Sequence, residues 1–143
     1  FSIKKILPSE LIINVKKTNF LGKTYISEKE FYIGSNGKLT PKLRVNQEKD
    51  LPFVFGKFSV NEFLKLQKLL KEEKFELNNI KNYFYHKGRR WDLENKDGKL
   101  IMLPYKNIKK SLKNYKNLVD EKVISNQKVI DLRIENKIVL VNE

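Results

Sequence analysis

The segment Arg89–Leu103 (RRWDLENKDGKLIML) decides the fold class, because it predicts two strands joined by a tight turn. In its first half the apolar residues Trp91 and Leu93 alternate with Asp92 and Glu94. Alternation with a period of two predicts a half-buried strand, with the apolar pair facing inward and the acidic pair facing solvent. An Asp-Gly pair then predicts a turn, since glycine tolerates positive φ, and the apolar residues after it return as a second strand.

Further strand signals lie on both sides of this hairpin. Strands are predicted where β-branched and aromatic residues gather between turn residues, over residues 9–17, 25–33, 77–85, 128–134 and 138–141. Ser35–Lys38 contains an Asn-Gly pair, which predicts a type I′ hairpin turn. Only Glu135, Asn136 and Lys137 separate the last two strands, so these are predicted to form the final hairpin.

Two helices are predicted between the strands. Ser59 followed three residues later by Glu62 is a capping-box pattern, which predicts the start of the first helix. Its expected buried stripe comprises Val60, Phe63, Leu64 and Leu70, with Leu66 and Leu69 beside them. The second helix is predicted over residues 107–119, where Ile108, Leu112, Tyr115 and Val119 recur at helical spacing. The pattern as a whole predicts an α+β fold, with a mainly antiparallel sheet and two principal helices packed on one side.

The chain is strongly basic. Its 143 residues include 30 Lys and Arg against 17 Asp and Glu, a formal net charge of +13. This charge raises the hypothesis of a nucleic-acid-binding module, which steeply salt-dependent binding to DNA or RNA would support. However, the lysines are spread along the whole chain, and the only arginines, which base and phosphate readers favour, are Arg44, Arg89, Arg90 and Arg133. We therefore interpret the charge as a solvated surface.

The sequence contains few candidates for catalysis or metal binding. It has no cysteine, which excludes disulfides, zinc–cysteine sites and thiol catalysis, and the single histidine, His86, could not build a zinc site alone. A hydrolase could use Asp92, Glu94 and Asp97, but a half-exposed strand followed by a turn explains the same residues. Aromatic residues that could stack on bases fall within apolar stripes, which favours core packing for Trp91, Phe63 and Tyr115.

Five segments along the chain carry recognisable motifs. They are residues 7–15 (LPSELIINV), a hairpin at 32–37 (YIGSNG), a Leu-Pro-x-x-x-Gly segment at 51–56, an Arg-Trp-x-Leu hairpin at 90–103 and a closing Val-Asp-Leu-Arg-like strand at 129–133 (VIDLR). In this order they resemble the FtsQ/DivIB family of bacterial cell-division proteins, and residues 7–15 are similar to the last strand of the small POTRA domain that precedes the family's β domain. Gly34 stands where the family usually has Asp, which weakens that hairpin match.

This resemblance implies a location and a role. It places the end of a POTRA-like domain at residues 1–18 and an FtsQ-type β domain at 19–143, on the periplasmic side of the inner membrane. Because no apolar run approaches the roughly 20 residues of a membrane span, a single-pass anchor is expected upstream. The resemblance also implies a connector of the divisome that binds the FtsB and FtsL proteins, without catalytic activity or cofactor. A POTRA-type assembly factor that captures unfolded strands is the alternative.

The final hairpin is the predicted site of partner binding. The segment 138–141 (IVLV) is apolar on both faces and lacks the charges and prolines that usually guard an edge strand. A strand that is covered by a helix or buried in the sheet would explain this, and so would an edge kept open for a partner strand. With the resemblance, the second hypothesis predicts contacts from Ile134, Asn136, Ile138 and Leu140, flanked by Arg133. Asp131 and Arg133 lie on one face of the preceding strand, which predicts a structural ion pair.

Overall fold

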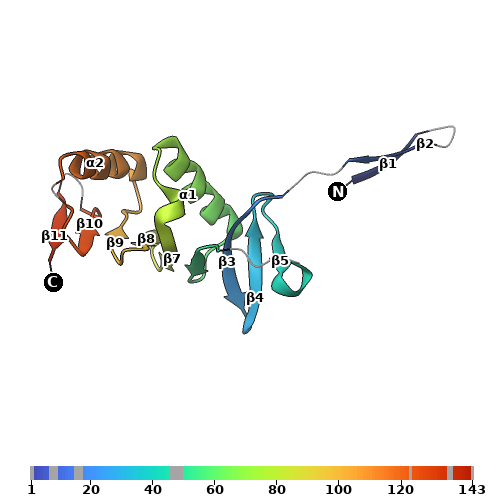
Figure 1. Ribbon diagram of the computed structural model, residues 1–143, viewed down its shortest axis with the longest axis horizontal. Helices are drawn as coiled ribbons and strands as arrows, with labels where there is room; N and C mark the ends of the chain where they lie inside the picture. The colour runs from blue at the N-terminus through green and yellow to red at the C-terminus, as the bar shows by residue number, and fades with distance from the viewer. Residues whose placement is uncertain are drawn as a thin grey trace.

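The computed structural model describes residues 2–6, 10–14, 18–45, 50–122, 124–134 and 137–142. Within them the large sheet contains nine strands and carries two α-helices on one side, so the predicted α+β fold is confirmed (Figure 1). The sheet strands are β3 (Phe20–Ile26), β4 (Lys29–Gly34), β5 (Leu39–Pro41), β6 (Phe53–Phe55), β7 (Ile80–His86), β8 (Arg90–Asn95), β9 (Leu100–Met102), β10 (Val129–Asp131) and β11 (Val139–Val141). The helices are α1 (Val60–Glu72) and α2 (Ile108–Asp120), with 3-10 turns at Lys42–Arg44 and Leu77–Asn79.

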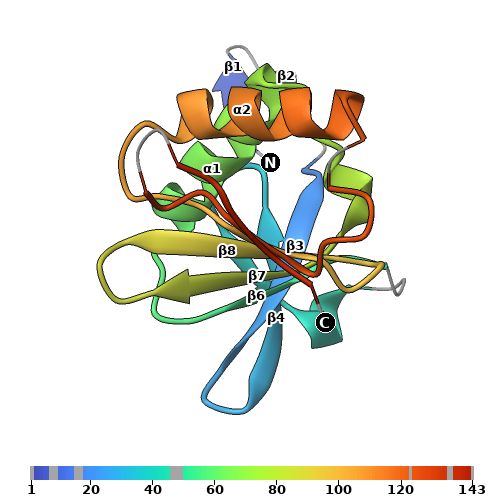
Figure 2. The ribbon, with the colours of Figure 1, turned by 90° about the vertical axis from the view of Figure 1, so that its left-hand side faces the viewer.

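The strand order of the sheet is β11-β10-β9-β8-β7-β6-β3-β4-β5. Neighbouring strands are antiparallel except for β9/β10, β3/β6 and β6/β7, which are parallel. The hairpin predicted from Arg89–Leu103 is present as β8 and β9, with Leu93 opposite Ile101. The sheet is strongly twisted, so that its strands cross in the end-on view of Figure 2.

A separate two-stranded sheet precedes the main domain. It consists of β1 (Ser2–Ile6) and β2 (Glu10–Asn14), paired antiparallel with Ile3 opposite Ile13. The strand predicted over residues 9–17 is therefore found as β2, whereas β1 was not predicted, and Val15, part of the predicted strand, lies outside the described residues. The domain boundary at residue 18 stays a prediction.

The capping box predicted for α1 is confirmed. Ser59 Oγ accepts a hydrogen bond from the Glu62 backbone N–H at 3.2 Å, and Glu62 Oε2 accepts one from the Ser59 N–H at 3.0 Å. The predicted buried stripe is partly wrong: Phe63, Leu66 and Leu70 are buried, and Gln67 lies beside them, whereas Leu64 is only half-buried. Gln67 is tolerated there because its amide donates a hydrogen bond to the buried Tyr83 hydroxyl at 2.9 Å. No helix among the described residues has the length and apolarity of a membrane span.

Both predicted glycine turns are present. Gly37 and Gly98 have φ of 81° and 87°, and their N–H groups bond to the carbonyls of Gly34 and Asn95 at 3.0 Å. Asn36 does not have positive φ, so the predicted type I′ geometry is wrong. The turn instead has its positive φ at Gly37 and not at the two residues before it.

Gly56 ends β6 at a position that only glycine fits. Its φ is 105°, and a Cβ atom added there would lie 2.2 Å from the backbone oxygen of Tyr85. This close approach lets β6 lie beside β7, with Val54 opposite Tyr83. The glycine of the Leu-Pro-x-x-x-Gly segment therefore has a steric role.

Candidate protein-interaction edge

The final hairpin forms one end of the sheet. β10 pairs antiparallel with β11, with Ile130 opposite Leu140 and Asp131 opposite Val139, so the predicted hairpin is confirmed. Within the part of the chain that the structure describes, β11 has β10 on one side and no strand on the other. It is the outermost strand at the left of Figure 1, with α2 above the hairpin. The sheet therefore ends in a strand whose outer side is unpaired.

The ladder of hydrogen bonds determines which main-chain groups of β11 are unpaired. The Leu132 N–H bonds to the Met102 carbonyl, and the Leu100 N–H bonds to the Lys128 carbonyl, both at 2.9 Å. Within β10, Ile130 therefore directs its main-chain groups toward β9, and Val129 and Asp131 direct theirs toward β11. The Lys128 N–H, just before β10, also bonds to the Val141 carbonyl at 2.9 Å. The partners of Val129 and Asp131 are Val141 and Val139. The N–H and C=O of Leu140, between them, point to the open side.

The opposite edge of the sheet is guarded. It is formed by β5, a strand of three residues that ends in Pro41 and runs directly into a 3-10 turn. Short length and proline are two devices by which proteins prevent an edge strand from pairing. β11 is equally short but contains no proline, so its main chain is less protected against pairing with a further strand.

The residues predicted to contact a partner occupy different environments. Ile138 and Leu140 are half-buried and pack against the hydrophobic core, whereas Ile134 is 52% exposed. Ile134 lies beyond the end of β10 and does not join the buried face that Ile130 and Leu132 form. Asn136 lies outside the described residues.

Arg133 and Asp131 form the ion pair predicted for them. Arg133 Nε bonds to Asp131 Oδ1 at 2.9 Å, and Nη2 bonds to Oδ2 at 2.7 Å. This two-point bond from the guanidinium lowers the pKa of Asp131 below its ordinary value, against the opposing effect of burial. The Arg133 side chain is still 39% exposed, so it can also contact a partner at the end of the hairpin.

Removing this ion pair should change how the free energy of unfolding depends on pH in the acidic range. Because the pKa of Asp131 is lowered from 3.8 in the folded protein, the pair stabilises the fold above that pH and is lost as the pH falls through the folded-state pKa. We expect Arg133→Gln to lower the free energy of unfolding near neutral pH by less than about 1 kcal/mol, and this loss should shrink as the pH falls below 3.8. Denaturant unfolding of both proteins from pH 2 to 7 measures the difference, with Lys128→Gln as the charge-matched control. A difference that is constant with pH would contradict the pair's role.

A groove lies beside the open edge, between the start of α2 and the end of the β10 segment. Its volume is about 310 Å³. Its apolar surface includes Tyr105 and Ile134, which are 48% and 52% exposed, and among the described residues that line it the charged ones are all cationic. The cationic side chains come from Lys106, Lys110, Arg133 and Lys137. Lys106 and Lys110 were not predicted as site residues, because their approach to Arg133 depends on tertiary packing.

The acidic residues considered for hydrolysis do not form a catalytic pair. Asp92 was predicted to face solvent, but it is only 4% exposed, because its Oδ2 lies 2.8 Å from His86 Nε2 and Arg90 Nη1 lies 3.7 Å from its Oδ1. Glu94 accepts a hydrogen bond from Asn82 at 2.8 Å, and Asp97 belongs to the β8–β9 turn. Among the residues described, no three His, Cys, Asp or Glu side chains gather as a metal site would require.

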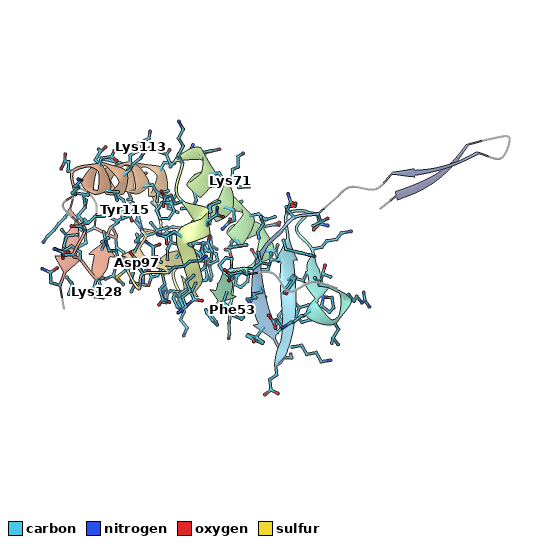
Figure 3. All side chains as sticks on the ribbon, viewed as in Figure 1. Phe53, Lys71, Asp97, Lys113, Tyr115 and Lys128 are labelled. Carbon is cyan, nitrogen blue, oxygen red and sulfur yellow. The ribbon has the colours of Figure 1, made fainter. Side chains whose placement is uncertain are left out.

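The aromatic residues considered for base stacking are mainly packed in the interior. Trp91 is 4% exposed and Phe63 is fully buried, and their rings lie 6.0 Å apart. Tyr115 is half-buried on α2 and stacks on Phe75 at 5.5 Å (Figure 3). Core packing is thus confirmed for Trp91 and Phe63.

Comparison with solved structures defines the class of fold. The chain is similar to the major extracytoplasmic domain of the bacterial cell division protein DivIB from Geobacillus stearothermophilus. The TM-score is 0.50 at 16% sequence identity, and the match covers 73% of this chain and 93% of that one. The fold is therefore that of the DivIB extracytoplasmic domain.

Comparison with sequences defines the family. A model of the C-terminal region of the cell division protein FtsQ/DivIB matches residues 25–133, and the chain belongs to this family. The cell division proteins FtsQ of Rhizobium radiobacter and of Agrobacterium fabrum are each 26% identical over 137 residues, which is 94% of this chain. The chain spans 65% and 43% of these two relatives. The resemblance seen in the sequence motifs is thereby confirmed.

Proposed function

We propose that this domain is a connector of the division machinery that binds FtsB, with FtsL, by accepting a strand at β11. The observation that carries the proposal is the unpaired edge, at which Leu140 directs its N–H and C=O outward. A partner strand would form main-chain hydrogen bonds there, and its alternate side chains would supply specificity. Because β11 has only three residues, these bonds alone give modest affinity, at about 0.5–1.5 kcal/mol each.

The adjoining groove would supply the remaining affinity. A partner chain leaving the edge near Ile138 passes the groove's apolar and cationic side chains. Acidic residues on the partner would be attracted to Lys137 and Lys106, and an apolar residue could pack on Ile134. The proposed partner segment is therefore an extended strand that is flanked by acidic and apolar residues.

The proposed setting follows from the family. We place the domain outside the cytoplasm, attached to the inner membrane by a single span upstream, with residues 1–18 as the end of a POTRA-like domain. The separate pairing of β1 with β2, apart from the large sheet, supports this division. In this setting the domain acts by holding other division proteins rather than by catalysis.

Deleting residues 138–143 tests the proposal. The deletion removes β11, and we expect it to abolish binding of the extracytoplasmic part of FtsB. Binding is measured by pull-down and calorimetry, and circular dichroism checks that the remainder is folded. The control is Lys71→Gln, an exposed change on α1 far from the edge. A folded deletion variant that binds FtsB with unchanged affinity would place the site elsewhere.

A further inference from the structure

A second exposed surface lies at the ends of β3, β6 and β7. The pairs β3/β6 and β6/β7 are parallel, so the turns that follow the three strands all lie beyond their C-terminal ends. In Figure 2 the β7–β8 turn projects at the left of the view and the β3–β4 turn at its lower end, because the sheet twists between them. We call this surface the strand-end rim and define it by Tyr25, Ile26, Lys29, Phe55, Lys57 and Lys87.

Three large apolar side chains of the rim are exposed to solvent. Tyr25 is 54% exposed, Ile26 45% and Phe55 39%. Tyr25 continues into a row of stacked rings across the sheet: Phe53 stacks on it at 5.5 Å, and Phe55 and Phe84 follow at 5.6 and 5.4 Å. The row lies on the side of the sheet away from the helices, where Figure 3 places Phe53. A contiguous apolar row at the surface is typical of a binding site.

Positive charges accompany these apolar residues. Lys29, Lys57 and Lys87 are exposed, and each lies in or next to one turn of the rim. None of these three lysines forms an ion pair within the described part of the chain. The acidic residue exposed between them is Glu28, whereas Glu30 is paired with Lys42 at 3.2 Å. The rim is therefore both apolar and cationic.

We propose that the strand-end rim docks the domain reversibly onto an anionic membrane surface. Aromatic and aliphatic residues at turn tips would enter the headgroup region, where amphipathic rings are favoured. Lysine stems can lie along the apolar layer while their ammonium groups contact lipid phosphates. The net charge of +13 adds long-range attraction to the same surface.

The composition of the rim favours lipid over other occupants. Protein interfaces are depleted in lysine, which is the charged residue here. Sugars and bases stack on aromatic rings whose faces are free. The rings of this row are nearly parallel, with interplanar angles of 10°, 21° and 16°, so their faces are partly covered by one another. The rim also lies at β3, β6 and β7, far along the strand order from β11, so membrane docking and partner binding can be tested separately.

Vesicle sedimentation tests this proposal directly. The chain is mixed with vesicles of phosphatidylcholine alone, or with about one third phosphatidylglycerol. Binding is expected only to the anionic vesicles, and each lysine near the surface should strengthen it roughly five-fold. Replacing Lys29, Lys57 and Lys87 with glutamine should thus weaken binding by about 100-fold.

Matched variants separate the rim from general basic attraction. Replacing Lys71, Lys113 and Lys116 on the helices removes the same charge from the other side of the sheet, and we expect less than a five-fold loss. Tyr25→Ser with Phe55→Ser should weaken binding while keeping every charge. Equal losses for the two lysine triples, or equal binding to neutral vesicles, would overturn the proposal. Rim-dependent binding to soluble polyglutamate without vesicle binding would also overturn it and indicate an acidic protein partner.

Discussion

Truncating Trp91 to alanine is expected to lower the free energy of unfolding by about 3–5 kcal/mol, the usual loss for a large buried aromatic side chain. Trp91 is 4% exposed. Its ring lies 4.8 Å from Tyr85, 5.9 Å from Phe58 and 6.0 Å from Phe63, centroid to centroid. The indole thus joins β7, β8 and the start of α1, and its removal would leave a cavity among these rings.

Chemical denaturation of the variant measures this loss. Tyr105→Ala is the control, because Tyr105 is 48% exposed, and its change should stay within about 0.5 kcal/mol. Trp91 is also the only tryptophan, so its fluorescence in the folded protein should be that of a buried indole. A loss below about 1 kcal/mol, or emission typical of an exposed indole, would contradict the packing around Trp91.

The features predicted correctly from sequence were mostly local. The capping box at Ser59, the glycine turns at Gly37 and Gly98, and the inward face of β8 each depend on residues within a few positions of one another. Local patterns of this kind follow from backbone sterics and hydrogen bonding. The final hairpin belongs to the same group, because three residues connect its two predicted strands.

The features that sequence reasoning missed depend on contacts between distant segments. Alternation placed Asp92 in solvent, but the His86 ring nitrogen 2.8 Å from its carboxylate and the nearby Arg90 guanidinium let it be buried. The insertion of β6 between β3 and β7 is likewise not visible in the sequence, because it pairs segments far apart in the chain. For the candidate site, the strand and its edge were predictable, whereas the cationic groove depends on how α2 packs beside Arg133.

Leu140→Pro should weaken the proposed binding of FtsB by at least about ten-fold. Proline removes the N–H that Leu140 directs to the open side, and an unpaired carbonyl on the partner costs about 1–3 kcal/mol. The hairpin itself should survive, because proline is tolerated on an edge strand where its N–H faces solvent. Val139→Pro should instead destabilise the hairpin, since Val139 faces Asp131 of β10. Calorimetric titration and thermal unfolding of both variants separate the two effects.

Two controls isolate the main-chain contribution. Leu140→Ala removes the side chain but keeps the N–H, so it should bind better than Leu140→Pro. Leu39→Pro makes the same change on β5, where the bond from the Gly34 N–H to the Lys38 carbonyl places Leu39 at an outward main-chain position. Leu39 also packs partly against the core, and we expect FtsB binding to be unchanged. Equal binding by Leu140→Pro and Leu140→Ala would argue against strand addition.

Hydrogen exchange at the Leu140 amide, followed by NMR with and without FtsB, tests the open edge most directly. In the free domain the Leu140 N–H should exchange quickly, whereas the Val139 and Val141 amides, which face β10, should exchange more slowly. Adding FtsB should slow exchange at Leu140 markedly and change its neighbours less. Saturating FtsB with unchanged exchange at Leu140 would contradict the claim that β11 accepts a partner strand.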